Sequence, residues 1–173
     1  MVRAGLGAKR KIGQGPRLLA GFAPAASVVI ASLLAALPIV SLSGWWPDFG
    51  FLVLIAWRLL RADAIPAWWA APLGLFNDLV LGLPVGFSVA LWTAALLALD
   101  LVDRRTMWRD YWVEWALAAL LILAYESAEW RVAQLMGASL PFGRIIPPLL
   151  ISIFTVPIAA WAVSRIDHWR LGR

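Results

Sequence analysis

The sequence contains no cysteine and a single histidine among its 173 residues. Without cysteine, disulfides, thiolate metal sites and cysteine nucleophiles are excluded. The one histidine, His168, falls in the expected cytoplasmic tail at the end of the chain, so neither a Ser-His-Asp triad nor a His-Glu-x-x-His zinc site is expected. The nucleophilic and zinc-hydrolase chemistries that depend on these arrangements are therefore not expected.

Charged residues are also scarce, at 14% of the chain, while 62% of the residues are hydrophobic and the mean hydropathy is +0.81. Ordinary globular domains are roughly half apolar and about a quarter charged. A soluble fold of this length cannot bury so much apolar surface, so lipid is the expected solvent. The net charge of +5 favours cytoplasmic loops and contact with anionic lipid over nucleic acid, because no basic stripe alternates with stacking aromatic residues.

The apolar runs predict an all-α integral membrane protein with six transmembrane helices. A spanning helix needs roughly 20 mostly apolar residues. Such segments lie at about 18–42, 48–60, 66–83, 85–101, 111–136 and 145–164. They form one membrane domain over 18–164, between a basic tail at 1–17 and a short tail at 165–173. The second segment is short, so a tilted or partly re-entrant helix is an alternative to a full crossing.

Basic residues set the expected orientation. With six spans, all but Arg131 and Arg144 of the fifteen basic residues fall in tails and loops on one side. The positive-inside rule makes that side cytoplasmic, and both termini with it. Indole side chains favour the lipid–water interface, and most tryptophans lie near predicted span ends: Trp45, Trp46, Trp57, Trp68, Trp69, Trp108, Trp112, Trp161 and Trp169.

Three acidic residues fall inside predicted spans, where a charge is costly and usually faces a protein interior or a water-filled cavity. A rise of ~1.5 Å per residue places Asp78, Glu126 and Glu129 in the same outer leaflet, with the two glutamates on one helix face. We therefore expect a pocket open to the outside. Asp78 is either a protonated structural acid that bonds a neighbouring helix with the help of Asn77, part of a ligand or partner site, or catalytic.

The remaining charges near span ends are expected to be solvated. Asp100 and Asp103 would lie beside Arg104 and Arg105 at the cytoplasmic boundary, and Arg131 would extend to the outer surface.

Two segments resemble the MreD family of bacterial rod shape-determining membrane proteins. GLFNDLVLGLPVGFSVAL is similar to the hallmark segment of that family, a Gly-Leu-x-x-Asp core followed by Gly-x-Pro-x-Gly. Upstream, PDFGFLVLIAWRLLRADAIP resembles the Pro-Asp start of the family's short second span. The match covers about 47–91. The basic N-terminal tail and the many tryptophans depart from the family pattern, and the last two spans carry no matching motif.

The resemblance implies a non-enzymatic component of the cell-elongation machinery in the bacterial inner membrane, without a cofactor. It implies binding to the scaffold MreC, with MreB, RodA and the transpeptidase partner of RodA as further partners. The fold would be similar to the six-helix substrate-capture subunit of energy-coupling-factor transporters. The positions that match the family motif, with a partner-binding or structural role, are Pro47, Asp48, Gly74, Asn77, Asp78, Gly82, Pro84 and Gly86.

Two other functions stay open. A solute-capture subunit of an energy-coupling-factor transporter would bind a vitamin-like solute saturably. A small lipid-modifying membrane enzyme would use clustered acids such as Glu126 and Glu129 to hold a divalent metal, and would lose activity when they are neutralised.

Overall fold

The computed structural model describes residues 17–37, 45–105 and 110–171, and these contain six α-helices and no strand. The helices are α1 (Arg17–Ala35), α3 (Phe49–Leu60), α4 (Ala70–Leu81), α5 (Phe87–Arg105), α6 (Tyr111–Leu135) and α7 (Ile146–Leu171). Two short 3₁₀ turns, η1 (Ala67–Trp69) and η2 (Phe142–Ile145), lead into α4 and α7. The α-helical fold expected from the sequence is confirmed.

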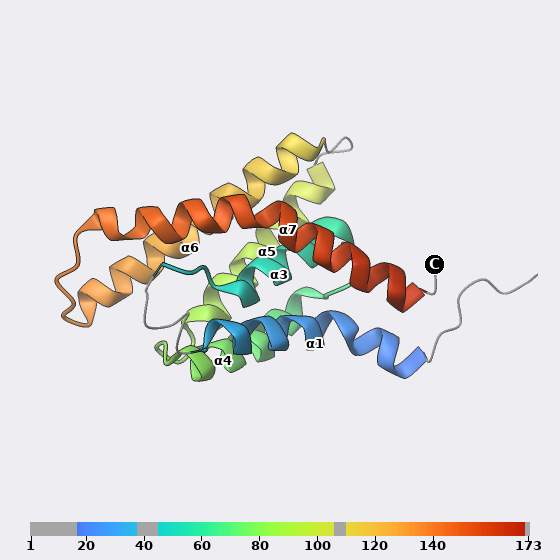
Figure 1. The fold of residues 1–173 in the computed structure, drawn as a ribbon, viewed down its shortest axis with the longest axis horizontal. Helices are drawn as coiled ribbons and strands as arrows, with labels where there is room; N and C mark the ends of the chain where they lie inside the picture. The colour runs from blue at the N-terminus through green and yellow to red at the C-terminus, as the bar shows by residue number, and fades with distance from the viewer. Residues whose placement is uncertain (1–16, 38–44, 106–109, 172–173) are drawn as a thin grey trace, which may run out of the picture.

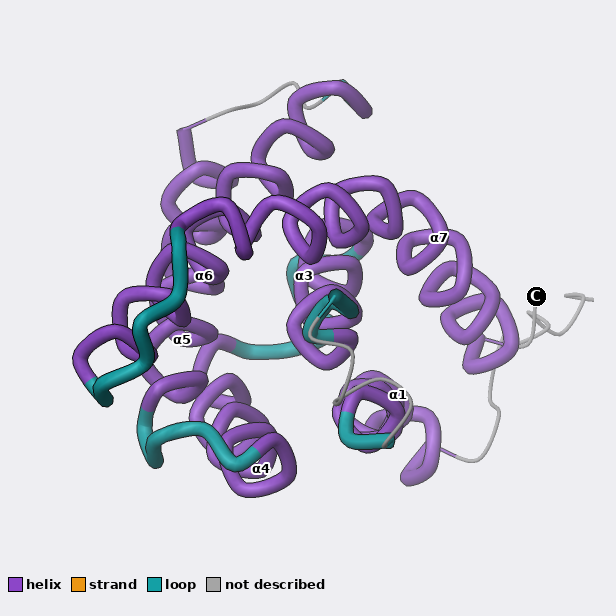
Figure 2. Tube along the Cα trace, turned by 60° about the vertical axis from the view of Figure 1, so that its left-hand side comes forward, coloured by secondary structure: helices purple, strands orange, loops and turns teal. Residues whose placement is uncertain are grey.

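The short helix α3 occupies the centre of the bundle, surrounded by the other five α-helices (Figure 2). Apart from Arg58 in the last turn, its sequence, FGFLVLIAWRLL, is apolar, which is typical of a helix buried all round. It packs mainly against α1 and α7, and Leu54 and Trp57 are fully buried in the core. Trp57 is therefore not the interfacial anchor that its position suggested: its indole N–H donates to Ser27 Oγ of α1 at 2.7 Å.

The helices α4 and α5 form the most closely packed pair. Gly82 ends α4 in the left-handed conformation, with a φ of 68°, which glycine adopts without the strain a Cβ would cause. Earlier in α4, a Cβ on Gly74 would come within 2.7 Å of the backbone of Val89. Glycine at this position therefore allows the two helix backbones to touch.

The helices α6 and α7 run side by side and are joined at one end of the molecule by the segment 136–145 (Figure 1). The carbonyl of Leu140 in this connection accepts hydrogen bonds from Trp130 Nε1 at 3.0 Å and Gln134 Nε2 at 2.5 Å. At the other end, α7 continues to Leu171. Residues 165–171 are therefore helical, where a short tail was expected.

The other predicted spans agree with the helices to within a few residues, except that α1 already ends at Ala35. The last part of the first predicted span, 38–42, lies outside the described residues. The expected basic tail, apart from Arg17, also lies outside the described residues, and so do residues 106–109 of the basic loop.

By length and composition, one helix among the described residues, Phe142–Arg170, is long and apolar enough to cross a bilayer. Two shorter apolar helices, Gly21–Ala35 and Phe49–Leu60, fall below that length. The apolar sequence of α6 is interrupted by Glu126 and Glu129 in its C-terminal half. The six crossings and the cytoplasmic placement of both termini remain predictions.

Candidate functional site

A cluster of polar side chains at the start of α3 connects four helices. Asp48 caps α3, because its Oδ1 accepts a hydrogen bond from the backbone N–H of Phe51 at 3.0 Å. Its Oδ2 accepts two more, from Asn77 Nδ2 of α4 and from the hydroxyl of Tyr125 of α6, both at 2.7 Å. The Asn77 amide also donates to Ser88 Oγ of α5 at 3.2 Å. One carboxylate thus joins α3, α4 and α6, and Asn77 adds α5.

Asp78 forms different hydrogen bonds from its neighbour Asn77. It is fully buried, and both of its carboxylate oxygens accept backbone N–H groups at the start of α5, from Gly86 and Ser88, each at 2.8 Å. A free helix N-terminus leaves such donors without partners and favours negative charge. Asp78 therefore acts from α4 as the cap of α5. This geometry supports the structural hypothesis for Asp78 among those that the sequence left open.

Beside this cluster, three acidic residues surround a partly open cavity of about 210 Å³. Asp48, Glu126 and Glu129 line it together with Tyr125, and apolar side chains from α1, α4 and α7 complete the wall. We call this end of the bundle, defined by Asp48, Glu126 and Glu129, the acid end. Glu126 is only 8% exposed, and Ser152 of α7 is its hydrogen-bond partner.

Glu129 lies where three hollows meet. Besides the acid cavity, it lines a hollow of about 180 Å³ toward α7, shared with Trp130 and Arg144. It also lines one of about 140 Å³ beside the α4–α5 connection, shared with Phe87. No ion pair joins Glu126 or Glu129 to a basic residue within the described ranges. Both carboxyl groups therefore face cavities, one of which Arg144 also lines.

The structure brings together most of the residues that the sequence singled out, but one acid of the cavity differs from the expected one. Glu126 and Glu129 line one cavity as expected, but Asp48 takes the place there that was expected of Asp78. Pro47 also lines the cavity, while Gly74 and Gly86 shape the contact between α4 and α5.

Sequence reasoning missed two members of the polar cluster, Tyr125 and Ser88. A signal for Tyr125 was available, because it stands next to Glu126 and is one of only two tyrosines in the chain. Ser88 gave no signal, since serine is common at helix starts.

At the opposite end of α3, three arginines pair with acids, and one of them, Arg58, is buried. Arg58 is 5% exposed and pairs with Asp100 and, at 3.0 Å, with Asp103, both on α5. Asp167 of α7 pairs with Arg170 at 2.8 Å and with Arg61 at 3.6 Å. We call this end, defined by Arg58, Arg61 and Arg170, the arginine end.

The ion pairs at the arginine end correct one expectation from the sequence. Asp100 and Asp103 are held by a buried arginine of another helix, and are not merely solvated charges beside the next basic residues in the chain. The same contact removes Arg58 from the loop charges that were counted to set the orientation, because it lies buried in the last turn of α3.

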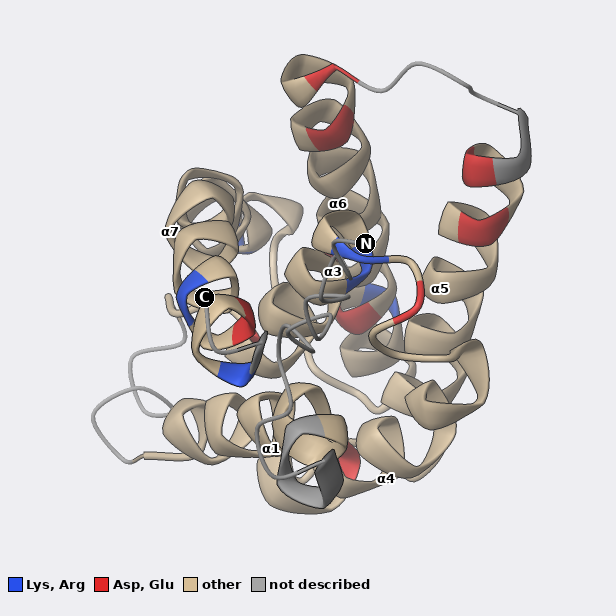
Figure 3. Cartoon of the chain, turned by 90° about the vertical axis from the view of Figure 1, so that its right-hand side faces the viewer, with Lys and Arg blue, Asp and Glu red and all other residues tan. Residues whose placement is uncertain are grey.

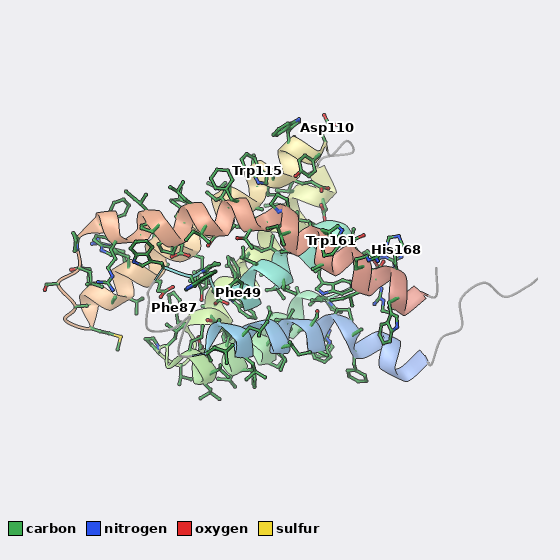
Figure 4. All side chains as sticks on the ribbon, viewed as in Figure 1. Phe49, Phe87, Asp110, Trp115, Trp161 and His168 are labelled. Carbon is green, nitrogen blue, oxygen red and sulfur yellow. The ribbon has the colours of Figure 1, made fainter. Side chains whose placement is uncertain are left out.

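The acid end can attract positive charge and donate or accept hydrogen bonds. Phe87 lies beside the acid end, because its ring packs on Tyr125 with ring centroids 5.5 Å apart. His168, the single histidine of the chain, lies toward the opposite end of the bundle from Phe87 (Figure 4). Among the described residues, no group of three acidic or histidine side chains is arranged to hold a metal ion.

The fold and this site define a helical bundle with a buried polar cluster and an acid-lined cavity at one end. No protein-family model, curated protein or solved structure matches the chain.

Proposed function

We propose that this protein is a multi-pass component of the bacterial inner membrane with a binding role, not an enzymatic one. The location is supported by the distribution of polarity. Leu135, Phe154 and Trp161 are 87%, 69% and 67% exposed, whereas buried polar and charged residues such as Arg58 and Asp78 point inward. Soluble proteins rarely expose large contiguous apolar patches. A surface of this kind is stable in lipid.

Exposed tryptophans support the same placement. Trp45 and Trp46 lie beside the acid end, and Trp68, Trp112 and Trp169 lie toward the arginine end. Two belts of exposed indoles at the two ends of a bundle are the arrangement that a bilayer favours. The proposed orientation puts the arginine end in the cytoplasm and the acid end outside.

We further propose that the acid end binds a partner, and that this partner is the scaffold MreC of the cell-elongation machinery. The observation that carries the proposal is the pair of glutamates, Glu126 and Glu129, which line cavities and form no ion pair within the described ranges, although Arg144 lines one of these cavities with them. The identity of the partner comes from the resemblance of the segments around Asp48 and Asp78 to the MreD family. Binding to MreB, RodA and its transpeptidase partner would follow through the scaffold.

Co-purification tests this function. The tagged chain is co-expressed with MreC, solubilised in mild detergent and captured, and the recovered MreC is quantified. We expect recovery with the natural chain and a loss of about 30-fold when Glu126 and Glu129 are both changed to Gln, because an unpaired charge would be left on the partner. Asp63→Asn is the matched control, since Asp63 is 83% exposed near the other end of α3. Failure of the natural chain to recover MreC would remove the proposed function.

The cavity also allows a second candidate to be considered, the solute-capture subunit of an energy-coupling-factor transporter, but its size argues against this candidate. Its volume of about 210 Å³ is below the roughly 300–1,000 Å³ typical of sites for drug-sized ligands. A protein side chain fits such a volume better than a vitamin. Saturable binding of a vitamin-like solute to the purified chain, measured by calorimetry, would support this candidate over the first.

A further inference from the structure

Two buried oxygen atoms near the start of α3 have no hydrogen-bond partner among the described residues. They are Ser32 Oγ of α1 and Asn77 Oδ1 of α4, and both side chains are fully buried. The Asn77 amide cannot be turned to satisfy its oxygen, because its nitrogen donates to Asp48 and Ser88. Buried polar atoms nearly always have a partner, so these two oxygens indicate a bound species.

Gly50 of α3 brings these two atoms to one place. A Cβ on Gly50 would overlap Ser32 Oγ and would lie 3.1 Å from both Asn77 Oδ1 and Asp48 Oδ1. Three oxygen atoms from α1, α4 and the cap of α3 therefore converge on the space that the absent side chain leaves. This space adjoins the acid cavity, which is lined by Asp48 and by Ala35, one turn after Ser32 on α1.

The three converging atoms are all oxygens, which is the ligand set of a hard cation. A helical serine can donate its hydroxyl hydrogen to the carbonyl four residues earlier, which leaves a lone pair of Ser32 for an ion. Divalent metal sites usually combine several carboxylates, and the described residues contain no group of three acidic or histidine side chains placed for one. One carboxylate with two neutral oxygens instead balances a single positive charge.

A water molecule would also satisfy the unpartnered oxygens, but the charge of Asp48 favours an ion. Both carboxylate oxygens of Asp48 accept hydrogen bonds, which is the role of an ionised carboxylate. Asp48 has no ion-pair partner within the described ranges, and neither α4 nor α1 beyond Arg17 carries a basic residue (Figure 3). Carboxylates inside a protein are normally paired with a positive charge or bound to a metal ion.

We propose that Asp48, Asn77 and Ser32 bind a sodium ion beside Gly50. The space is that of one absent methyl group, which suits sodium better than the larger potassium ion. Water from the acid cavity completes the coordination shell. The bound ion ties α1, α3 and α4 together at the acid end. The inference goes beyond the proposed function and does not depend on the identity of the partner.

Thermal unfolding of the purified full chain in detergent tests the site, because an ion that binds only the folded state raises the melting temperature. Tryptophan fluorescence follows unfolding while sodium chloride replaces N-methylglucamine chloride at constant ionic strength. We expect the melting temperature to rise by about 3 °C or more for each tenfold increase in sodium above the dissociation constant, and by less with potassium chloride. The same melting temperature in all three salts would show that water fills the site. That result, or an equal rise with potassium, would overturn the proposal.

Two variants locate the ion. Ser32→Ala removes one ligand and should raise the sodium concentration needed for half of the effect about tenfold or more. Gly50→Ala places a methyl group where the ion lies and should abolish the response. Thr155→Val is the control, because the Thr155 hydroxyl donates to the carbonyl of Ile151 within α7, and it should respond as the natural chain does. An unchanged response in Ser32→Ala and Gly50→Ala would place the sodium elsewhere and refute the site.

A direct binding measurement covers the case in which these variants do not fold. Radioactive sodium should bind the natural chain at a single saturable site, and no saturable binding would refute the proposal. None of these outcomes bears on the recovery of MreC, so the proposed function is tested separately.

Discussion

The charged side chains at the two ends of α3 differ in whether they form ion pairs within the chain. At the arginine end, each of Arg58, Arg61 and Arg170 pairs with an acid of this chain, and the pairs tie α3 to α5 and α7. At the acid end, Glu126 and Glu129 face cavities instead. Charges matched within a chain serve its own fold, whereas charges left facing a cavity are available to another molecule. The difference separates residues that should matter for stability from residues that should matter for binding.

The largest stability effect is expected at the arginine end. Arg58→Met keeps the volume of the side chain but leaves Asp100 and Asp103 without their shared partner. Removing one member of a buried ion pair typically costs about 3 kcal/mol, and this much of the unfolding free energy should be lost in an SDS titration followed by tryptophan fluorescence. The same change at Arg144, an exposed arginine near the acid end, should shift the unfolding free energy by less than about 0.5 kcal/mol. Equal effects at both positions would erase the contrast between the ends.

The next effect concerns the helix cap provided by Asp78. Asp78→Ala leaves the buried N–H of Ser88 and the partly buried N–H of Gly86 without acceptors, which should lower the unfolding free energy by about 2 kcal/mol. Asp78→Asn keeps one acceptor oxygen and should cost less. At a temperature where the Asp78→Ala chain is folded, it should still recover MreC. If the folded Asp78→Ala chain no longer recovers MreC, Asp78 belongs to the binding site after all.

A smaller loss is expected where α4 touches α5. In Gly74→Ala the new methyl group would lie within 2.7 Å of the Val89 backbone nitrogen. The helices must then separate slightly, at a cost of about 1–2 kcal/mol in unfolding free energy. A Cβ on Gly143 meets open space, so Gly143→Ala should be nearly neutral in the same titration. If Gly74→Ala is also neutral, the contact between the two backbones is looser than described.

The smallest stability effect should come from the acid end itself. Glu129→Gln removes a carboxyl group that has no ion-pair partner in the described ranges, so the unfolding free energy should change by less than about 0.5 kcal/mol. Recovery of MreC should nevertheless fall. If the Glu129→Gln chain loses stability but keeps full recovery of MreC, the acid end serves the fold and not binding.

The helices could be predicted from the sequence because their apolar runs are local signals, and the bounds of α3, α5 and α6 came within a few residues. The glutamates were also grouped correctly, since a spacing of three residues fixes a shared helix face. The position of Asp48 in the cavity could not be predicted. It depends on contacts with Asn77 and Tyr125, which lie far along the chain.

The arginine end escaped prediction for a related reason. Positive-inside counting treats Arg58 as a loop charge, but it belongs to the last turn of α3 and points into the bundle. Only the packing of α3 against α5 brings it to Asp100. Sequence spacing along one helix gives no information on such a pairing between helices.

The most direct test of the account is the side of the membrane on which each end lies. The chain has no cysteine, so Ser139→Cys in the α6–α7 connection and Asp63→Cys after α3 each introduce a single thiol at an exposed site. With a membrane-impermeant thiol reagent on intact spheroplasts, the account predicts labelling at position 139, and labelling at position 63 only after the membrane is opened. Labelling of position 63 in intact spheroplasts would contradict it.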